Sequence, residues 1–129
     1  MRPEDRDAGC LWDMLDAART VRDFTTGVGL DEYRADRKLQ LAVERAIEII
    51  GEAARLVSAS FKEQHPEIPW QQIIAQRHVL AHDYGEISHD RIWLVATRRI
   101  PDLINQLEPL LPPPPADHDG GPESGGALS

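Results

Sequence analysis

The sequence predicts an all-α protein folded as an antiparallel four-helix bundle. Four segments carry apolar residues at alternating steps of three and four, the spacing of one face of a helix. The segments are separated by short stretches rich in glycine or proline, and no segment shows the alternating pattern of a strand. Since each helix has to bury one apolar stripe, packing the four against one another is the simplest solution.

The first two predicted helices carry the longest apolar stripes. The first helix ends near Thr26 and Gly27, and its stripe consists of Leu11, Met14, Leu15, Ala18 and Val21. Asp31 is the expected N-cap of the second helix, which should run from about Glu32 to Ser60. The stripe of this longest helix consists of Leu39, Val43, Ala46, Ile47, Ile50, Ala53, Ala54 and Val57.

Prolines and a serine mark the bounds of the last two helices. Pro66 and Pro69 in the segment HPEIPW end the long helix, and Pro69 suits the first turn of a third helix with Trp70, Ile73, Ile74 and Leu80. Ser88 is the expected cap of the fourth helix, which should kink or restart at Pro101. Its apolar residues are Ile92, Val95, Ala96, Leu103, Ile104 and Leu107.

Composition divides the chain into a helical domain, residues 1–111, and a tail, residues 112–129. The tail, PPPPADHDGGPESGGALS, is dominated by proline, glycine and serine, so we expect it to be disordered. The chain has one cysteine, Cys10, and therefore no internal disulfide. No apolar run reaches the roughly eighteen residues of a membrane span, and no secretory leader is recognisable, so we expect a cytoplasmic protein without a membrane partner.

The net charge is −8, and residues 1–111 carry −5, with 19 acidic against 14 basic residues. Broad neutralisation of a phosphate backbone needs clustered lysine and arginine, so any contact with nucleic acid has to be local, and DNA is not an expected partner. A symmetric dimer that gathers its few arginines in one cleft is compatible with this charge.

The segment RHVLAHDY, residues 77–84, concentrates reactive side chains at the end of the third helix. Arg77 is a permanently charged fork that can clamp a phosphate, and His82 can move protons near neutral pH. Together they suffice for RNA cleavage without a metal or cofactor, because the substrate's own 2′-hydroxyl is the nucleophile. The alternative is an ordinary solvated helix terminus, where cations are common.

The spacing of this pair favours a dimer. A step of five residues places Arg77 and His82 about 140° apart around an ideal helix, so they converge only if the helix ends between them or a second subunit contributes. Two copies that meet across a two-fold axis would pair them in a shared cleft.

These residues resemble the R-x4-H-x-Y motif of HEPN-domain ribonucleases, in particular the HepT family of bacterial toxins. The stretches AIEIIGEAARL, HPEIPW and HVLAHDYGEI are similar to the same family in the same order, so the likeness covers about residues 8–107. The resemblance implies a HEPN fold, a homodimer with the active cleft at its interface, tRNA or mRNA as substrate, and Arg77 and His82 as catalytic residues. It also implies a minimal nucleotidyltransferase antitoxin that adds AMP to Tyr84, where bulk and negative charge would repel RNA.

Three further residues are candidates for supporting roles. His78 stands where this family most often has asparagine, and it can orient Arg77, bind substrate or carry a proton, which leaves the general base and acid unassigned. Asp83 follows His82 directly. Glu52 interrupts the apolar stripe of the long helix, so we expect it to pair with an arginine or a helix end, or to line the cleft near Arg77.

Other interpretations remain open. His78 and His82 have the spacing of a shared metal site that Asp83 or His89 would complete, but the glutamate of H-E-x-x-H is missing and we expect no metal. Arg98 and Arg99 either extend a phosphate-binding surface or solvate the fourth helix. The tryptophans Trp12, Trp70 and Trp93 are assigned to packing. The rival function is a catalytically silent HEPN scaffold or substrate-binding partner of a nucleotidyltransferase.

Overall fold

The structure, a computed structural model, describes the backbone of residues 3–82 and 89–111 and the side chains of residues 6–76 and 89–111. These residues form helices and short turns and contain no strand, which confirms the predicted all-α class. The helices are α1 (Pro3–Thr25), α2 (Leu30–Ala35), α3 (Arg37–Leu56), α4 (Ala59–Gln64), α5 (Trp70–His82), α6 (His89–Leu94), the π-helix η1 (Val95–Arg99), α7 (Ile100–Leu107) and the 3₁₀ helix η2 (Glu108–Leu110).

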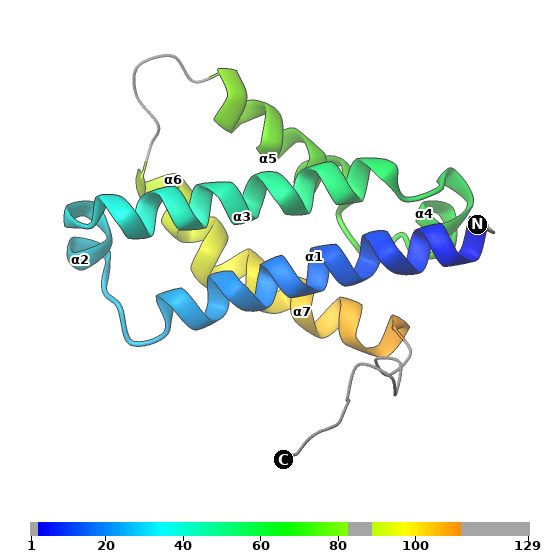
Figure 1. The fold of residues 1–129 in the computed structure, drawn as a ribbon, viewed down its shortest axis with the longest axis horizontal. Helices are drawn as coiled ribbons and strands as arrows, with labels where there is room; N and C mark the ends of the chain where they lie inside the picture. Colours follow the sequence, from blue (N-terminus) through cyan, green and yellow to red (C-terminus); the bar gives the residue numbers. More distant parts are fainter. Residues whose placement is uncertain (1–2, 83–88, 112–129) are drawn as a thin grey trace, which may run out of the picture.

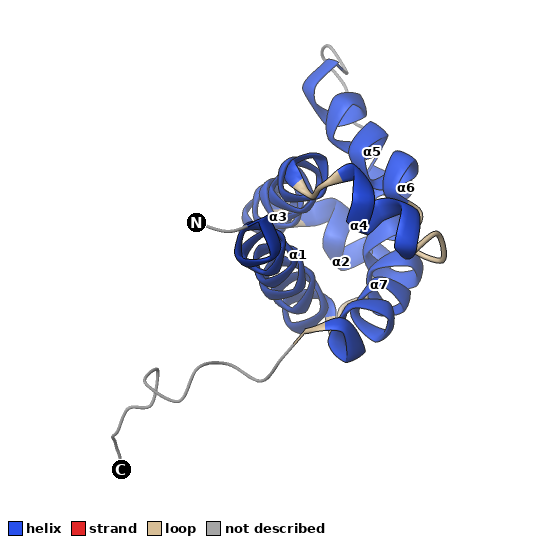
Figure 2. Cartoon of the chain, turned by 90° about the vertical axis from the view of Figure 1, so that its right-hand side faces the viewer, coloured by secondary structure: helices blue, strands red, loops and turns tan. Residues whose placement is uncertain are grey.

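Four long segments, α1, α3, α5 and the continuous run α6–η1–α7, follow one another in alternating directions (Figure 1). Helix α3 packs against both α1 and α5, and α7 packs against α1. Seen end-on, α1, α3 and α7 surround the core, and α5 extends outward from the bundle (Figure 2). Within the described part of the chain, no helix has both the length and the apolar character needed to cross a membrane.

The core consists of the apolar stripes that the sequence predicts. The stripe of α1 is almost fully buried, with Leu11, Met14, Leu15, Ala18 and Val21 each at most 2% exposed. Trp70 is 7% exposed, and Trp12 and Trp93 are partly buried against the core, which agrees with the packing role assigned to the tryptophans. The first helix ends at Thr25, and Gly27 follows with φ 78°, a conformation that glycine adopts at little cost.

The predicted single helix from Glu32 to Ser60 is wrong, because the chain breaks it twice. At the first break Asp36 takes an extended conformation, and its carboxylate accepts the backbone N–H of Leu39 at 3.0 Å. Asp36 is thus the N-cap of α3, whereas Asp31 lies exposed inside α2. An aspartate side chain that satisfies a free N–H offers the backbone an alternative to a continuing helix, which explains the break.

The second break, at Val57 and Ser58, is also where α1 is tied to the rest of the bundle. The Ser58 hydroxyl accepts the N–H of Phe61 at 3.1 Å and caps α4. The same hydroxyl, at 2.7 Å, and the backbone N–H of Ser58, at 2.9 Å, donate to the buried carboxylate of Asp7 in α1. The connection between α3 and α4 is therefore held against the start of the chain.

The fourth predicted helix restarts as expected. Pro101 lies in the first turn of α7, directly after the widened π-helical turn of η1. Proline has no backbone N–H to donate, and in a helix its ring clashes with the carbonyl of the residue four positions earlier. The wider turn before Pro101 relieves this clash. The predicted cap Ser88 lies outside the described residues.

Candidate active site

Helix α5, which carries the R-x4-H motif, is anchored at its beginning. The indole N–H of Trp70 donates to the backbone carbonyl of His65 at 2.9 Å, and Ile73 and Ile74 pack against the core. Beyond these residues α5 leaves the bundle, so that its C-terminal end projects from the body of the protein (Figures 1 and 2). The part of α5 that carries Arg77 and His82 thus extends away from the bundle.

Arg77, His78 and His82 all belong to α5, which continues without interruption to His82. The backbone there is described and the side chains are not; Asp83 and Tyr84 lie outside the described residues altogether. Because the helix does not end between Arg77 and His82, the two positions remain about 140° apart around its axis.

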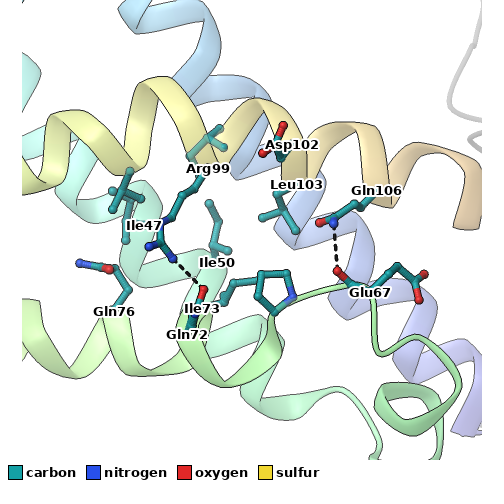
Figure 3. Close-up of a pocket in the computed structure, with 13 residues that line it drawn as sticks. Ile47, Ile50, Glu67, Gln72, Ile73, Gln76, Arg99, Asp102, Leu103 and Gln106 are labelled. Carbon is teal, nitrogen blue, oxygen red and sulfur yellow. Dashed lines mark hydrogen bonds between the residues drawn. The ribbon is translucent and has the colours of Figure 1, made fainter.

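A groove of about 320 Å³ runs between α5 and the fourth segment (Figure 3). Its apolar residues come from α3, α5, η1 and α7, and polar side chains form its rim. The residues that line it are Ile47, Ile50, Glu67, Pro69, Gln72, Ile73, Gln76, Val95, Arg99, Ile100, Asp102, Leu103 and Gln106. Since Gln76 directly precedes Arg77, the groove follows α5 up to the first residue of the motif.

Two hydrogen bonds cross this groove. The Arg99 guanidinium donates through Nη1 to the Gln72 side-chain carbonyl at 2.7 Å, and the Gln106 amide donates to the backbone carbonyl of Glu67 at 3.0 Å (Figure 3). Arg99 and Arg98 are both exposed. The hydrogen bond to Gln72 holds the Arg99 side chain toward α5. The groove thus has the Arg99 guanidinium at its edge, and Glu67 and Asp102 are the acidic residues that line it.

Glu52 lies outside the buried stripe of α3, contrary to the position expected from the sequence. Its side chain is 47% exposed, and its Oε2 accepts from Nη2 of Arg55 at 2.7 Å. At 100° per residue, Glu52 lies about 160° around the helix from Ile50, which places it on the outward side. The arginine partner expected for Glu52 is therefore present, three residues further along the same helix.

A polar cluster that sequence reasoning missed packs where α6 begins. The ring of Tyr33, which is fully buried, contacts the rings of Trp93 and His89, with centroids 5.1 and 6.0 Å away. The Glu44 carboxylate is 12% exposed and approaches Nδ1 of His89 at 4.0 Å. The Tyr33 hydroxyl, Glu44 Oε2 and His89 Nδ1 have no hydrogen-bond partner among the described residues. The signal in the sequence that could have revealed this cluster is Glu44, which directly follows Val43 of the apolar stripe of the long helix.

Burial controls the titration of this cluster. Desolvation raises the pKa of Glu44, and the nearby His89 and Arg37 only partly oppose that shift. Desolvation, followed by the negative charge of Glu44, raises the pKa of Tyr33 well above its usual range. The cluster therefore favours a neutral tyrosine, and it joins α2, α3 and the beginning of α6, the helix that follows the motif.

Among the side chains that the structure describes, no three His, Cys, Asp or Glu residues are arranged to hold a metal ion. The metal site considered from the sequence uses His78, His82 and Asp83, which fall outside those side chains.

Comparison with known proteins gives consistent matches over most of the chain. The "Probable ribonuclease HepT" of Thermococcus cleftensis is 36% identical over 100 residues, which cover 78% of this chain and 91% of the relative. The "Putative RNase MJ1380" of Methanocaldococcus jannaschii is 33% identical over 98 residues, covering 76% of this chain and 90% of the relative. The "Putative RNase TTE0752" of Caldanaerobacter subterraneus is 33% identical over 85 residues, covering 66% and 76%. No solved structure gives a significant match.

The family model "Ribonuclease HepT-like" matches residues 14–110, which include nearly all of the helical bundle and the whole RHVLAHDY segment. The chain thus belongs to the HepT-like family of ribonucleases.

Proposed function

We propose that this protein is a metal-independent endoribonuclease and the toxin of a toxin–antitoxin pair, with Arg77 and His82 as its catalytic residues. The observation that carries the proposal is the R-x4-H-x-Y motif inside a HepT-like ribonuclease domain, with Arg77 and His82 on a helix that projects from the bundle. Arginine and histidine are the side chains that phosphate clamping and proton transfer require.

In the proposed reaction, a histidine removes the proton of the substrate's 2′-hydroxyl. The oxygen attacks the adjacent phosphorus, and the bond from phosphorus to the 5′-oxygen breaks as that oxygen takes a proton. The products are a 2′,3′-cyclic phosphate and a 5′-hydroxyl. His82 is the first candidate for proton transfer, with His78 as the second proton carrier, and Arg77 stabilises the charge that grows on the phosphate oxygens.

The proposed active form is a homodimer. Supporting this, α5 runs unbroken through Arg77 and His82, so that one copy holds the two positions on different sides of a helix. A second copy of α5 across a two-fold axis supplies the missing partner and doubles the local positive charge. This local concentration of arginine lets an acidic chain bind an RNA backbone.

The proposed antitoxin is a minimal nucleotidyltransferase that modifies Tyr84. The tyrosine oxygen attacks the α-phosphorus of ATP, AMP becomes attached to the ring oxygen, and pyrophosphate leaves. The added phosphate and nucleoside, two residues from His82, repel RNA by charge and block the cleft by bulk.

Cleavage of total RNA by the purified protein in the presence of EDTA tests the nuclease proposal. We expect Arg77→Ala and His82→Ala each to lower the cleavage rate about 10²- to 10⁴-fold, and their expression to spare cells that the wild type stops growing. The exposed Arg22 and the remote His65 provide matched controls, since Arg22→Ala and His65→Ala remove the same chemical groups elsewhere. Loss of RNA cleavage in EDTA contradicts the metal-independent mechanism. If cells that express the wild type grow as well as cells that express the variants, the silent scaffold is favoured.

The antitoxin proposal has a separate readout. Incubation with a minimal nucleotidyltransferase and ATP should add the mass of AMP to the peptide containing Tyr84 and stop RNA cleavage in parallel. Tyr84→Phe should keep cleaving and resist the antitoxin. AMP found on Tyr33 instead would contradict the assignment, although the complete burial of that side chain speaks against it.

A further inference from the structure

The outward side of α3 carries large apolar side chains that the bundle leaves uncovered. Leu41 is 48% exposed, Ile49 36% and Leu56 50%, and Arg45 and Glu52 lie between them on the same side of the helix. We call these five residues the α3 outer face. Large apolar side chains exposed on one helix face are candidates for contact with another protein. In Figure 1 this helix lies between α5 and α1.

The order of residues on the α3 outer face is self-complementary. Counted from the point between Glu48 and Ile49, Leu41 and Leu56 are equally far away in opposite directions, and so are Arg45 and Glu52. If two copies of α3 pack antiparallel about that point, each Leu41 meets Leu56 of the second copy and each Arg45 meets Glu52 of the second copy. At about 1.5 Å per residue, the two leucine contacts lie roughly 22 Å apart, which suits one helix–helix interface.

The charges on this face match the same arrangement. Glu52 bonds to Arg55 at 2.7 Å, and Arg45 lies 3.5 Å from Glu48, so both halves of the face hold an ion pair within the same chain. All four side chains are at least 40% exposed and can turn toward a neighbour. In the antiparallel pair, Glu52 keeps its bond to Arg55 and faces a second arginine, Arg45 of the other copy. Opposite charges therefore meet on both sides of the centre of the interface, between the two leucine contacts.

We propose that the α3 outer face is the two-fold interface at which two copies of this chain associate. The inference rests on the proposed function, which requires a second copy, and it adds the surface through which that copy binds. The two-fold axis that relates antiparallel helices face to face is perpendicular to both and to the line between them. Elements on one flank of α3 consequently stay on the same side in both copies.

This symmetry has a direct consequence for the motif. Helix α5 lies on one flank of α3 and α1 on the other (Figure 1). The interface therefore brings both copies of α5, each with its projecting end, to the same side of the dimer.

A pair of leucine variants tests the surface. We expect the wild-type protein to have twice the 14.5 kDa chain mass by light scattering at micromolar concentration. Leu41→Glu combined with Leu56→Glu should raise the dissociation constant about 100-fold or more, because the carboxylates would be buried against each other. Leu94→Glu is the matched control, since Leu94 is 48% exposed on α6 and lies off this face, and it should remain dimeric. Circular dichroism shows whether each variant is folded.

Charge exchange gives a second test that misfolding cannot imitate. Arg45→Glu places like charges opposite each other in the homodimer, and so does Glu52→Arg, so each variant alone should dissociate more readily than the wild type. An equimolar mixture of the two restores both opposite-charge contacts and should form a heterodimer. The doubly exchanged chain, Arg45→Glu with Glu52→Arg, should pair with itself.

The outcomes separate this inference from the proposed function. A monomeric wild type, or a dimer indifferent to the leucine and charge variants, overturns the α3 interface, whereas RNA cleavage that depends on Arg77 and His82 would still support the nuclease. A dimer that dissociates as expected while the wild type cleaves no RNA confirms the surface and contradicts the nuclease.

Discussion

At the scale of single residues, the polar cluster of Tyr33, Glu44 and His89 is the part of the core with the most unfavourable electrostatics. A carboxylate that is 12% exposed loses most of its hydration, and the imidazole 4.0 Å away returns only part of it. His89 is the first residue of α6, so the free energy that this cluster costs affects how stably the beginning of α6 packs on the bundle.

Glu44→Gln should make the protein more stable than the wild type at neutral pH. The folded-state pKa of Glu44 is raised above 4.5, so its contribution to stability is fully present below that pH and is lost as the pH rises through the folded pKa. The neutral glutamine avoids this loss. We expect urea denaturation to show the advantage of the variant growing from about pH 4 to pH 7. Glu63→Gln, on the exposed side of α4, serves as the control, and an advantage independent of pH would contradict this explanation.

At the scale of the helices, the bounds of α3 depend on one aspartate side chain. The sequence, with Asp31 as the expected cap, predicts a single helix through Asp36, yet the carboxylate of Asp36 holds the N–H of Leu39 and the chain turns. Periodicity reports which face is buried and is silent about where a side chain competes for the backbone.

Asp36→Ala should therefore lower the free energy of unfolding by about 0.5–2 kcal/mol, the usual cost of losing an N-cap. Asp31→Ala is the matched control, because its side chain is 98% exposed and its contact with Arg34 is a surface ion pair at 3.5 Å. Its effect should stay below about 0.5 kcal/mol by chemical denaturation. Equal losses in the two variants would contradict the capping role of Asp36.

At the scale of the whole molecule, the fold separates a packed bundle from the helix that carries the motif. The stripes of α1, α3 and α7 bury one another, while α5 is secured near Trp70 and extends away at the other end. This arrangement places Arg77 and His82 on the projecting part of α5. It also predicts that the bundle's stability depends little on residues beyond its last packed side chains.

A chain that ends after Leu111 should keep the stability of the full-length protein within about 0.5 kcal/mol, and it should keep its RNA cleavage. Leu110 and Leu111 are the last described residues that pack against the core, and the predicted tail begins just after them. Ending the chain after Gln106 removes Leu107, which is fully buried, and should cost several kcal/mol. Thermal unfolding distinguishes the two truncations, and a large loss from the first would show that the tail belongs to the domain.

The sequence by itself determined the all-α class, the four apolar stripes and the RHVLAHDY motif, because each of these is a local pattern read along one helix. The tertiary structure decided what depends on residues far apart in the chain. Asp7 meets Ser58, Glu44 meets His89, and the groove forms where α5 faces α7. Periodicity cannot reveal such contacts, since it records which side of a helix is buried and not which partner covers it. The same holds for the α3 outer face: its leucines are visible in the sequence, but only the packed bundle leaves them exposed.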